Sequence, residues 1–282
     1  MTFPSLLVGL RLGLLVGMVW GLTACRELIT FPVKGGREQI VIEGYVTNET
    51  GPYWVRISRS LPYFGSNDFP GVDSAKVWIE STDGQVDTLF QADGYPGFYF
   101  TRRLIGRPNT GYHLTAVVGQ DTFTASTWMA SHAKLVSLSL RYDGEGTTAP
   151  TFEKGWYPII AGKDPDTAGN YYRIRVFVND SLFNGPLDYA IDKLVSDKFF
   201  IQGQIIAVEI SNAPLKAGDR CVIELMNLNP DLYIFYQQIG SQLSAGSPFA
   251  PPGESINSNI RGGALGYFAA YSSSKLEVTI PE

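Results

Sequence analysis

The side chains that could carry acid–base or nucleophilic chemistry are few in this chain of 282 residues. Its two histidines are His113, inside an apolar–polar alternation typical of a strand, and His132, in a connecting stretch. A histidine-assisted nucleophile needs a nucleophile, a base and an orienting acid held together, and the sequence contains no G-x-S-x-G, H-E-x-x-H or C-x-x-C motif. The sequence therefore predicts that the protein is not an enzyme and that both histidines are structural.

Two short stretches hold groups that bind phosphate or metal ions in other proteins. Residues 144–149 match the glycine pattern of a dinucleotide-binding loop, but Pro150 follows at once, so no helix N-terminus is placed to meet a phosphate. Residues 164–170 begin with the D-x-D arrangement of a calcium loop, but Ala168 and Arg175 stand where an EF-hand loop needs ligands. A turn in which aspartates bond their own backbone is the favoured interpretation. No cofactor and no metal ion is predicted.

The aromatic residues are more informative. In the stretches 53–57 and 76–81 aliphatic residues alternate with tryptophans, so Trp54 and Trp78 project from the outer face if the aliphatic residues face the core. Exposed aromatic side chains mark partner surfaces or platforms on which sugars stack. The alternative is that another part of the chain covers them. The candidate contact residues are Trp54, Trp78, Tyr63, Phe64, Phe249 and Tyr267.

Charge and cysteine content exclude some classes of partner and scaffold. The 22 Lys and Arg residues against 27 Asp and Glu give a net charge of −5. A mildly acidic chain without a Lys/Arg run lacks the basic footprint of a nucleic-acid-binding protein, so no nucleic-acid partner is predicted. The two cysteines are Cys25 and Cys221. Cys221 alternates with apolar residues and is expected to be a buried small hydrophobic residue rather than a nucleophile.

Short strands joined by turns are expected in the first region of the fold, residues 38–130. The chain has 30 glycines, 17 prolines and 13% aromatic residues, and this region shows repeated period-2 alternation with turn residues between the runs. Seven short strands over such a length predict a β-sandwich of immunoglobulin or transthyretin type. The expected strands lie near residues 40–46, 53–57, 76–81, 85–91, 97–101, 113–118 and 122–127.

A second β-sandwich domain, residues 131–282, is expected after the boundary at Met129–Leu135. One helix over residues 230–243 interrupts it, because Asn229 is suited to cap that helix, Pro230 suits its first position and an apolar stripe follows. The segment 244–268 is expected to be a packed loop without regular structure until Gly266–Phe268, and its part Ser247–Phe268 is expected to contribute to the contact surface. The predicted fold class is therefore all-β, with two sandwich domains. The other expected strands lie near residues 138–142, 172–178, 199–201, 205–210, 221–225 and 276–280.

The N-terminus predicts export and lipid attachment. An uncharged segment, Leu12–Leu22, has the length of a secretory h-region and is shorter than the roughly 20 residues of a membrane span. The sequence Leu22-Thr23-Ala24-Cys25 follows and resembles the lipobox of bacterial lipoproteins. This resemblance implies a signal peptide over residues 1–24, acylation of Cys25 and a tether over residues 25–37. The alternatives are an ordinary signal peptide with a chance cysteine, or an uncleaved anchor.

Several local patterns together resemble one family. The two most specific are Glu38–Asn48 and Ser258–Phe268; the others are Asp164-Pro165, Asn170-Tyr171-Tyr172 and Ser196-Asp197 ahead of Gly203-Gln204. They look like a domain-of-unknown-function group of Bacteroidota lipoproteins that are commonly encoded beside TonB-dependent outer-membrane receptors.

The resemblance implies a lipid-anchored outer-membrane protein, exposed at the cell surface, that serves as a non-catalytic accessory or ligand-capturing subunit of such a receptor in nutrient uptake. The periplasmic face is the alternative location. The runner-up function is a structural or adhesive surface lipoprotein that binds glycan or matrix without a transporter. An enzyme comes third, because no spacing among the 27 acidic residues selects a catalytic carboxylate pair.

Overall fold

A computed structural model describes residues 38–61, 69–145, 153–165, 169–183, 193–199, 204–210, 214–244 and 256–282. All of these residues belong to one compact unit, Arg37–Glu282. The predicted signal peptide, Cys25 and the tether lie outside the described residues, as do Tyr63, Phe64 and Phe249 among the candidate contact residues. Among the described helices, none is long and apolar enough to cross a membrane.

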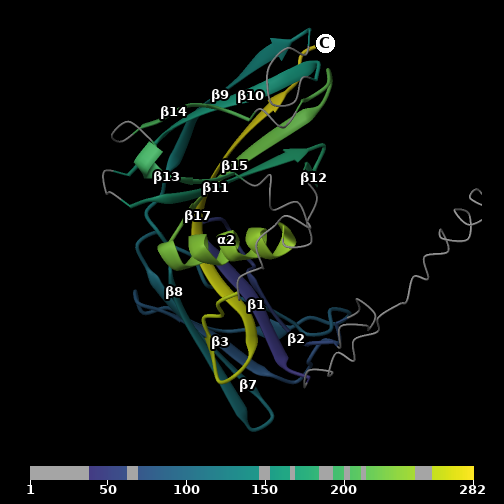
Figure 1. Ribbon diagram of the computed structural model, residues 1–282. Coiled ribbons are helices and arrows are strands. Elements are labelled where there is room, and N and C mark those ends of the chain that lie inside the picture. Colours follow the sequence, from purple (N-terminus) through teal and green to yellow (C-terminus); the bar gives the residue numbers. More distant parts are fainter. Residues whose placement is uncertain are drawn as a thin grey trace, which may run out of the picture. The chain divides into compact units, whose positions relative to one another are not determined.

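Three β-sheets and one α-helix make up the described fold, which confirms the predicted all-β, sandwich-like class (Figure 1). Sheet A has the order β12 (Ser181–Leu182), β11 (Tyr171–Val178), β15 (Arg220–Leu228), β17 (Leu265–Thr279), β1 (Ile40–Thr47), β2 (Trp54–Arg59), β6 (Phe98–Phe100) and β5 (Phe90–Gln91), with β13 (Lys193–Ser196) also paired to β11. Sheet B has the order β16 (Ile260–Arg261), β8 (Asp121–Trp128), β7 (Gly111–Val118), β3 (Lys76–Ser81) and β4 (Val86–Thr88). Sheet C has the order β14 (Gln204–Glu209), β10 (Gly155–Lys163) and β9 (Lys134–Asp143). The helices are α2 (Pro230–Ser244) and a short 3-10 turn, η1 (Asp197–Phe199).

Strand β17, 15 residues long, connects the two halves of sheet A. Its first half pairs in parallel with β1, from Val41↔Leu265 to Thr47↔Tyr271, and its second half continues the antiparallel ladder with β15. The parallel pairing requires a close approach at Gly266, where φ is +105° and a Cβ atom would lie 2.1 Å from the carbonyl oxygen of Ile42. Glycine is therefore the residue that fits this position.

Two hydrophobic cores lie on the inner face of sheet A. One joins sheet A to sheet B and contains Ile42, Val55, Val77 and Ile79, as the alternation predicts. The other involves sheets A and C, and Cys221 lies in it, fully buried. Phe268 on β17 packs in the first core rather than the second. The two cores are thus not each built from a contiguous stretch of sequence, which the predicted limits 38–130 and 131–282 had assumed.

The expected elements are largely present, with differences at the C-terminus. The helix begins at Pro230 and ends at Ser244, and the Asn229 side-chain oxygen accepts a hydrogen bond from the Leu232 amide at 2.9 Å, which confirms the predicted cap. Within the expected loop, the two residues of β16 pair with β8, and β17 begins at Leu265, one residue before the expected return to regular structure. Phe199, expected in a strand, ends η1 instead.

Candidate functional site

Helix α2 packs on the outer face of sheet A, opposite the two cores. In Figure 1 it lies across β17, at the level where this strand passes from β1 to β15. Its Leu232 is fully buried and packs in a third apolar cluster with Met226, Leu228 and the outward residues of β17. The residues of β17 that face the helix are Tyr267, Ala269 and Tyr271. The helix covers only part of this face, so a cavity remains beside it.

This cavity, the aromatic cavity, has a volume of about 490 Å³, within the range of small-molecule sites. Its floor comes from strands β1, β2, β11 and β17, and its wall from the exposed edge of α2. Phe235 of the helix stacks on Tyr267 of the sheet with 4.3 Å between ring centroids. The lining residues are Glu43, Gly44, Tyr45, Trp54, Arg175, Leu232, Phe235, Tyr236, Ile239, Gly266, Tyr267, Ala269 and Tyr271.

A row of aromatic rings crosses the sheet from this cavity toward its edge. Tyr45 lies 6.2 Å from Tyr271 and 5.1 Å from Trp54, and Trp54 lies 5.5 Å from Phe98, all between ring centroids. Phe100, two residues along β6, stacks on Phe98 with centroids 6.4 Å apart. This row, Tyr271–Tyr45–Trp54–Phe98–Phe100, is called the aromatic ladder below. Tyr45 lies opposite Ala269 and Trp54 lies opposite Phe100, so the contacts Tyr45–Tyr271 and Trp54–Phe98 are diagonal ones between adjacent strands, which large aromatic rings can span.

Two charged groups of opposite sign line the aromatic cavity. The Arg175 Nε donates to the Glu224 carboxylate at 2.7 Å, and Glu224, only 2% exposed, also accepts from the Ser273 hydroxyl at 2.7 Å. This buried ion pair is completed by the second donor of Arg175, the Nη2 atom. Glu43 contributes a half-exposed carboxylate whose nearest cation, Arg56, is 3.9 Å away. The cavity thus offers both a hydrogen-bond donor and an acceptor of full charge.

Three tyrosine hydroxyls of the cavity, those of Tyr45, Tyr267 and Tyr271, stay protonated over a wide pH range. Burial raises the pKa of Tyr45, Tyr267 and Tyr271 above the ordinary tyrosine value, because the charged form would lose its hydration. The described part of the chain provides no hydrogen-bond partner for the hydroxyls of Tyr267 and Tyr271. They are therefore available to a ligand as neutral donors and acceptors.

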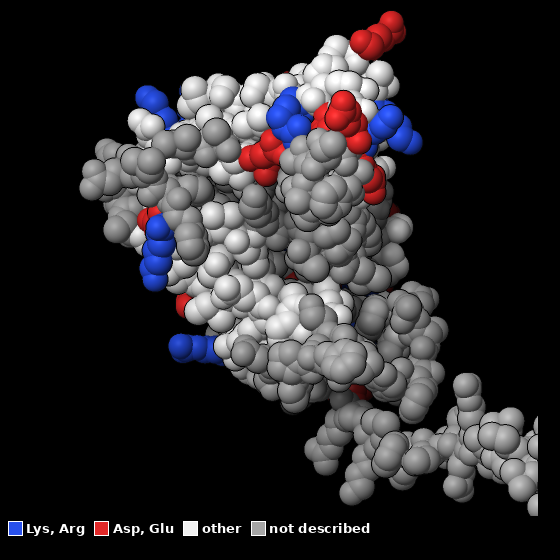
Figure 2. All heavy atoms as spheres, turned by 45° about the horizontal axis from the view of Figure 1, so that its top comes forward, with Lys and Arg blue, Asp and Glu red and all other residues white. Residues whose placement is uncertain are grey.

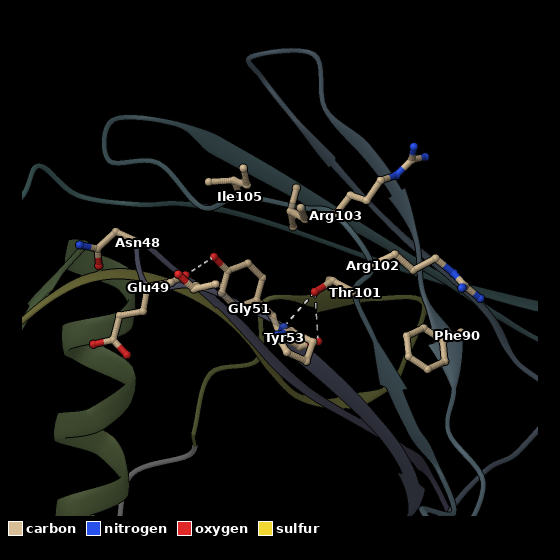
Figure 3. Close-up of a pocket in the computed structure, with 12 residues that line it drawn as sticks. Asn48, Glu49, Gly51, Tyr53, Phe90, Thr101, Arg102, Arg103 and Ile105 are labelled. Atoms are coloured by element: carbon tan, nitrogen blue, oxygen red, sulfur yellow. Dashed lines mark hydrogen bonds between the residues drawn. The ribbon is translucent and has the colours of Figure 1, made fainter.

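A second cavity, the loop cavity, has a volume of about 650 Å³ and lies at one end of the first sandwich. Figure 3 shows its lining, residues 48–53, Phe90 and residues 101–105. The Arg102 guanidinium lies over the Phe90 ring, 4.5 Å from its centroid. Glu49 is bound to Lys275 at 2.7 Å. The charged groups Arg102 and Glu49 are thus already engaged with the protein.

Backbone hydrogen bonds hold the walls of the loop cavity. The Tyr53 hydroxyl oxygen lies 2.7 and 2.6 Å from the carbonyl oxygens of Thr47 and Glu49, which share its single proton, and it accepts from the Gly106 amide at 3.0 Å. The buried Asp87 carboxylate accepts from three successive amides, those of Arg102, Arg103 and Leu104, at 2.6–2.9 Å. The backbone groups named here are thus hydrogen-bonded within the protein.

The structure brings two of the predicted contact residues together. Trp54 and Tyr267 both line the aromatic cavity, although Tyr267 is only 8% exposed. Trp78 lies on sheet B, where its strand neighbours are Thr88 and Thr115, so the two tryptophans project from different sheets and do not form one patch. The predicted Trp54/Trp78 face does not exist as a single surface.

Sequence reasoning missed most of the cavity. Tyr45, Arg175, Tyr236 and Tyr271 were not selected, because the cavity exists only after β17 has paired with β1 and β15. A signal was present for β17, where Tyr267 and Tyr271 are four residues apart and so share one face of a strand.

The remaining chemistry-bearing residues are placed as follows. His113 Nδ1 lies 2.9 Å from the Ser126 hydroxyl on the neighbouring strand, and His132 Nδ1 lies 3.4 Å from the Asn48 amide nitrogen. Burial raises the pKa of the Cys221 thiol to about 11. In the described segments no three His, Cys, Asp or Glu side chains are grouped to hold a metal ion. Figure 2 shows acidic and basic side chains interspersed among uncharged ones on the face drawn.

Comparison with known proteins gives a family. The chain matches the family model described as a domain of unknown function, DUF4249, over residues 26–277, and therefore belongs to that family. None of the curated proteins matches the chain. Among solved structures, the chain is similar to the crystal structure of a DUF4785 family protein from Legionella pneumophila, with 11% sequence identity and a TM-score of 0.26. That match covers 66% of this chain and 52% of the Legionella protein, so the chain spans about half of that protein's length.

Proposed function

We propose that the protein is a lipid-anchored outer-membrane lipoprotein of a Bacteroidota cell that captures a ligand for a TonB-dependent receptor and performs no catalysis itself. The observation that carries this proposal is the aromatic cavity. A ligand-sized cavity with aromatic walls and a few convergent polar groups is typical of a binding site. In this cavity the polar groups are a stable ion pair and neutral hydroxyls, which suit recognition of a ligand.

The N-terminal sequence supports the anchored location. A diacylated and N-acylated Cys25 would hold the protein at the membrane, since two acyl chains already give stable anchoring. Confinement beside a receptor raises the effective concentration of each partner for the other, so modest contacts suffice for a complex. The tether over residues 25–37 would allow the folded unit to reach the receptor.

The alternative function is that of an adhesive surface lipoprotein without a transporter. The aromatic ladder favours it as a second candidate, because the rings continue beyond the cavity to Phe98 and Phe100, which are only partly buried. Tyr95, 58% exposed, lies 6.0 Å from Phe100 and extends the apolar surface further. A surface of this kind suits a long polymer as well as a small ligand.

Co-purification in mild detergent tests the proposal. The tagged native protein is isolated from outer membranes, and mass spectrometry identifies its N-terminus and any stoichiometric partner. We expect acylated Cys25 and a TonB-dependent receptor. Acylated protein recovered alone would favour the adhesive alternative, and an unmodified N-terminus at another residue would contradict the anchor.

A pair of cysteine variants separates the anchor from the fold. Cys25→Ser removes the acylation site, and we expect the protein to leave the membrane fraction with its folded unit intact. Cys221→Ser is the matched control, because Cys221 lies in the second core and its loss should leave membrane association unchanged. Equal membrane retention of both variants would overturn the assignment of Cys25.

A further inference from the structure

We infer that the aromatic cavity binds a neutral carbohydrate, with Trp54 as the main stacking surface and Glu43, Arg175 and Tyr267 as hydrogen-bonding groups. This inference deepens the proposed function and rests on its ligand-capturing role, because it names the chemical class of the captured ligand.

The balance of charge in the cavity excludes strongly charged ligands. A cation would lie against Arg175, whereas an anion would lie against Glu43 and near the buried Glu224. Arg175 is already paired with Glu224, so an anion gains little from it and meets the carboxylate of Glu43, whereas a cation beside Glu43 meets Arg175. A neutral ligand with many hydroxyl groups avoids both repulsions, because a hydroxyl both donates to a carboxylate and accepts from a guanidinium.

Unused hydrogen-bonding capacity in the cavity matches such a ligand. Arg175 donates hydrogen bonds from its Nε and Nη2 atoms to Glu224. Its Nη1 atom has no hydrogen-bond partner in the described part of the chain. The hydroxyls of Tyr267 and Tyr271 are likewise unused by the described residues. A purely apolar ligand would leave all of these groups without water or a partner. Hydroxyl groups on a sugar ring can satisfy them together.

The aromatic side chains supply the other half of a sugar site. Sugar rings have an apolar face of C–H groups, which packs on aromatic rings, whose faces carry partial negative charge. Trp54 is the largest ring in the cavity and is half-buried at the point where the cavity meets the aromatic ladder. The ladder continues this surface onto β6, so a chain of several sugar units fits better than a single unit.

The backbone of the floor argues against a peptide ligand. Strands β1, β2 and β17 are interior strands of sheet A, each paired with a neighbour on both sides. Their backbone amides and carbonyls are therefore already hydrogen-bonded to the neighbouring strands. A peptide cannot add a strand to the sheet at this place. Recognition must come from side chains, as it does for carbohydrates.

Binding measurements with matched tryptophan variants test the inference. The full mature chain in mild detergent is titrated by calorimetry against neutral oligosaccharides (glucans, xylans, mannans, galactans and chitin oligomers), with uronate polymers and peptides as comparison probes. We expect at least one neutral oligosaccharide to bind. Trp54→Ala should weaken that binding about tenfold or more, whereas Trp78→Ala should leave it within about twofold, because Trp78 projects from sheet B.

Conservative variants keep the test independent of folding. Glu43→Gln and Tyr267→Phe change one polar group each, and we expect each to weaken binding several-fold with an unchanged unfolding midpoint. The inference is overturned if no neutral oligosaccharide binds, if Trp54 and Trp78 variants lose binding equally, or if only uronates or peptides bind. Receptor co-purification is a separate readout, so sugar binding without a receptor, or a receptor without sugar binding, tells which of the two proposals has failed.

Discussion

The aromatic cavity and the loop cavity differ in what their polar groups do. Tyr53 lines the loop cavity and is hydrogen-bonded to backbone groups, and the Asp87 carboxylate binds the amides of the wall residues 102–104. In the aromatic cavity, the hydroxyls of Tyr267 and Tyr271 and one nitrogen of Arg175 have no partner among the described residues. These polar groups beside the loop cavity are therefore satisfied within the protein, whereas those of the aromatic cavity are available to a ligand.

The volume of a cavity is therefore a poor guide to whether the cavity can bind a ligand. The loop cavity is larger, at about 650 Å³ against about 490 Å³. Binding free energy comes from groups that gain a partner when the ligand enters, and groups already satisfied within the protein gain nothing. Four variants or conditions would break or sharpen this distinction.

The largest expected effect is that of Asp87→Ala in the loop cavity. Removal of the buried carboxylate leaves the amides of Arg102, Arg103 and Leu104 without their acceptor, and we expect a loss of about 3 kcal/mol or more in the free energy of unfolding. Urea denaturation measures this. Asp93→Ala, at an exposed turn position, is the control and should stay within about 0.5 kcal/mol. A loss below about 1 kcal/mol for Asp87→Ala would contradict the structural assignment.

A pair of tyrosine variants compares the two cavities directly. Tyr53→Phe removes a hydroxyl with three backbone contacts, and we expect it to cost about 1–3 kcal/mol of stability. Tyr267→Phe removes a hydroxyl without a partner in the described structure and should change stability by less than about 0.5 kcal/mol. Equal losses in the two variants, measured by chemical denaturation, would remove the distinction between the cavities.

Loss of the helix cap should lower the stability of the protein and also weaken ligand binding in the aromatic cavity. Asn229 caps α2 through the Leu232 amide and donates to the Trp128 carbonyl at 2.7 Å. Asn229→Ala should therefore cost about 1–2 kcal/mol and weaken ligand binding, because α2 forms one wall of that cavity. Asn229→Ser retains a capping oxygen and should lose less. If both variants destabilise equally, the cap is not the source of the effect.

The smallest expected effect is a change in how steeply the stability of the protein falls at alkaline pH. Burial raises the pKa of Tyr267 and Tyr271 in the folded protein, whereas the unfolded chain ionises near pH 10. The unfolded state therefore loses protons first, and stability falls as the pH rises above about 10. The double variant Tyr267→Phe/Tyr271→Phe should lose stability less steeply as the pH rises above about 10, as measured by urea denaturation at each pH. Identical slopes would show that these hydroxyls are not buried in solution.

The strand pattern and the helix could be predicted because both depend on neighbouring residues. Period-2 alternation placed Val55 and Ile57 inside and Trp54 outside, and the Asn229-Pro230 pair marked the start of α2. The segment before Gly266 was predicted to be irregular, so the two strand residues Ile260–Arg261 and the start of β17 at Leu265 were missed. Its glycines indicated irregular structure, whereas in the fold Gly266 lets β17 approach β1.

Export and lipid attachment are predictions from a local N-terminal motif. The all-β fold and the outward tryptophans can be read directly from the order of residues, since both depend on alternation along single strands. The aromatic cavity cannot. It requires β17 to pair with β1, more than two hundred residues earlier in the chain, and α2 to settle on the opposite face of that sheet. These contacts place Trp54 beside Tyr45 and the helix, and leave Trp78, in an equivalent alternation, on another sheet between threonines. Local sequence sets the side on which a side chain leaves its strand, and pairing between distant strands sets its neighbours.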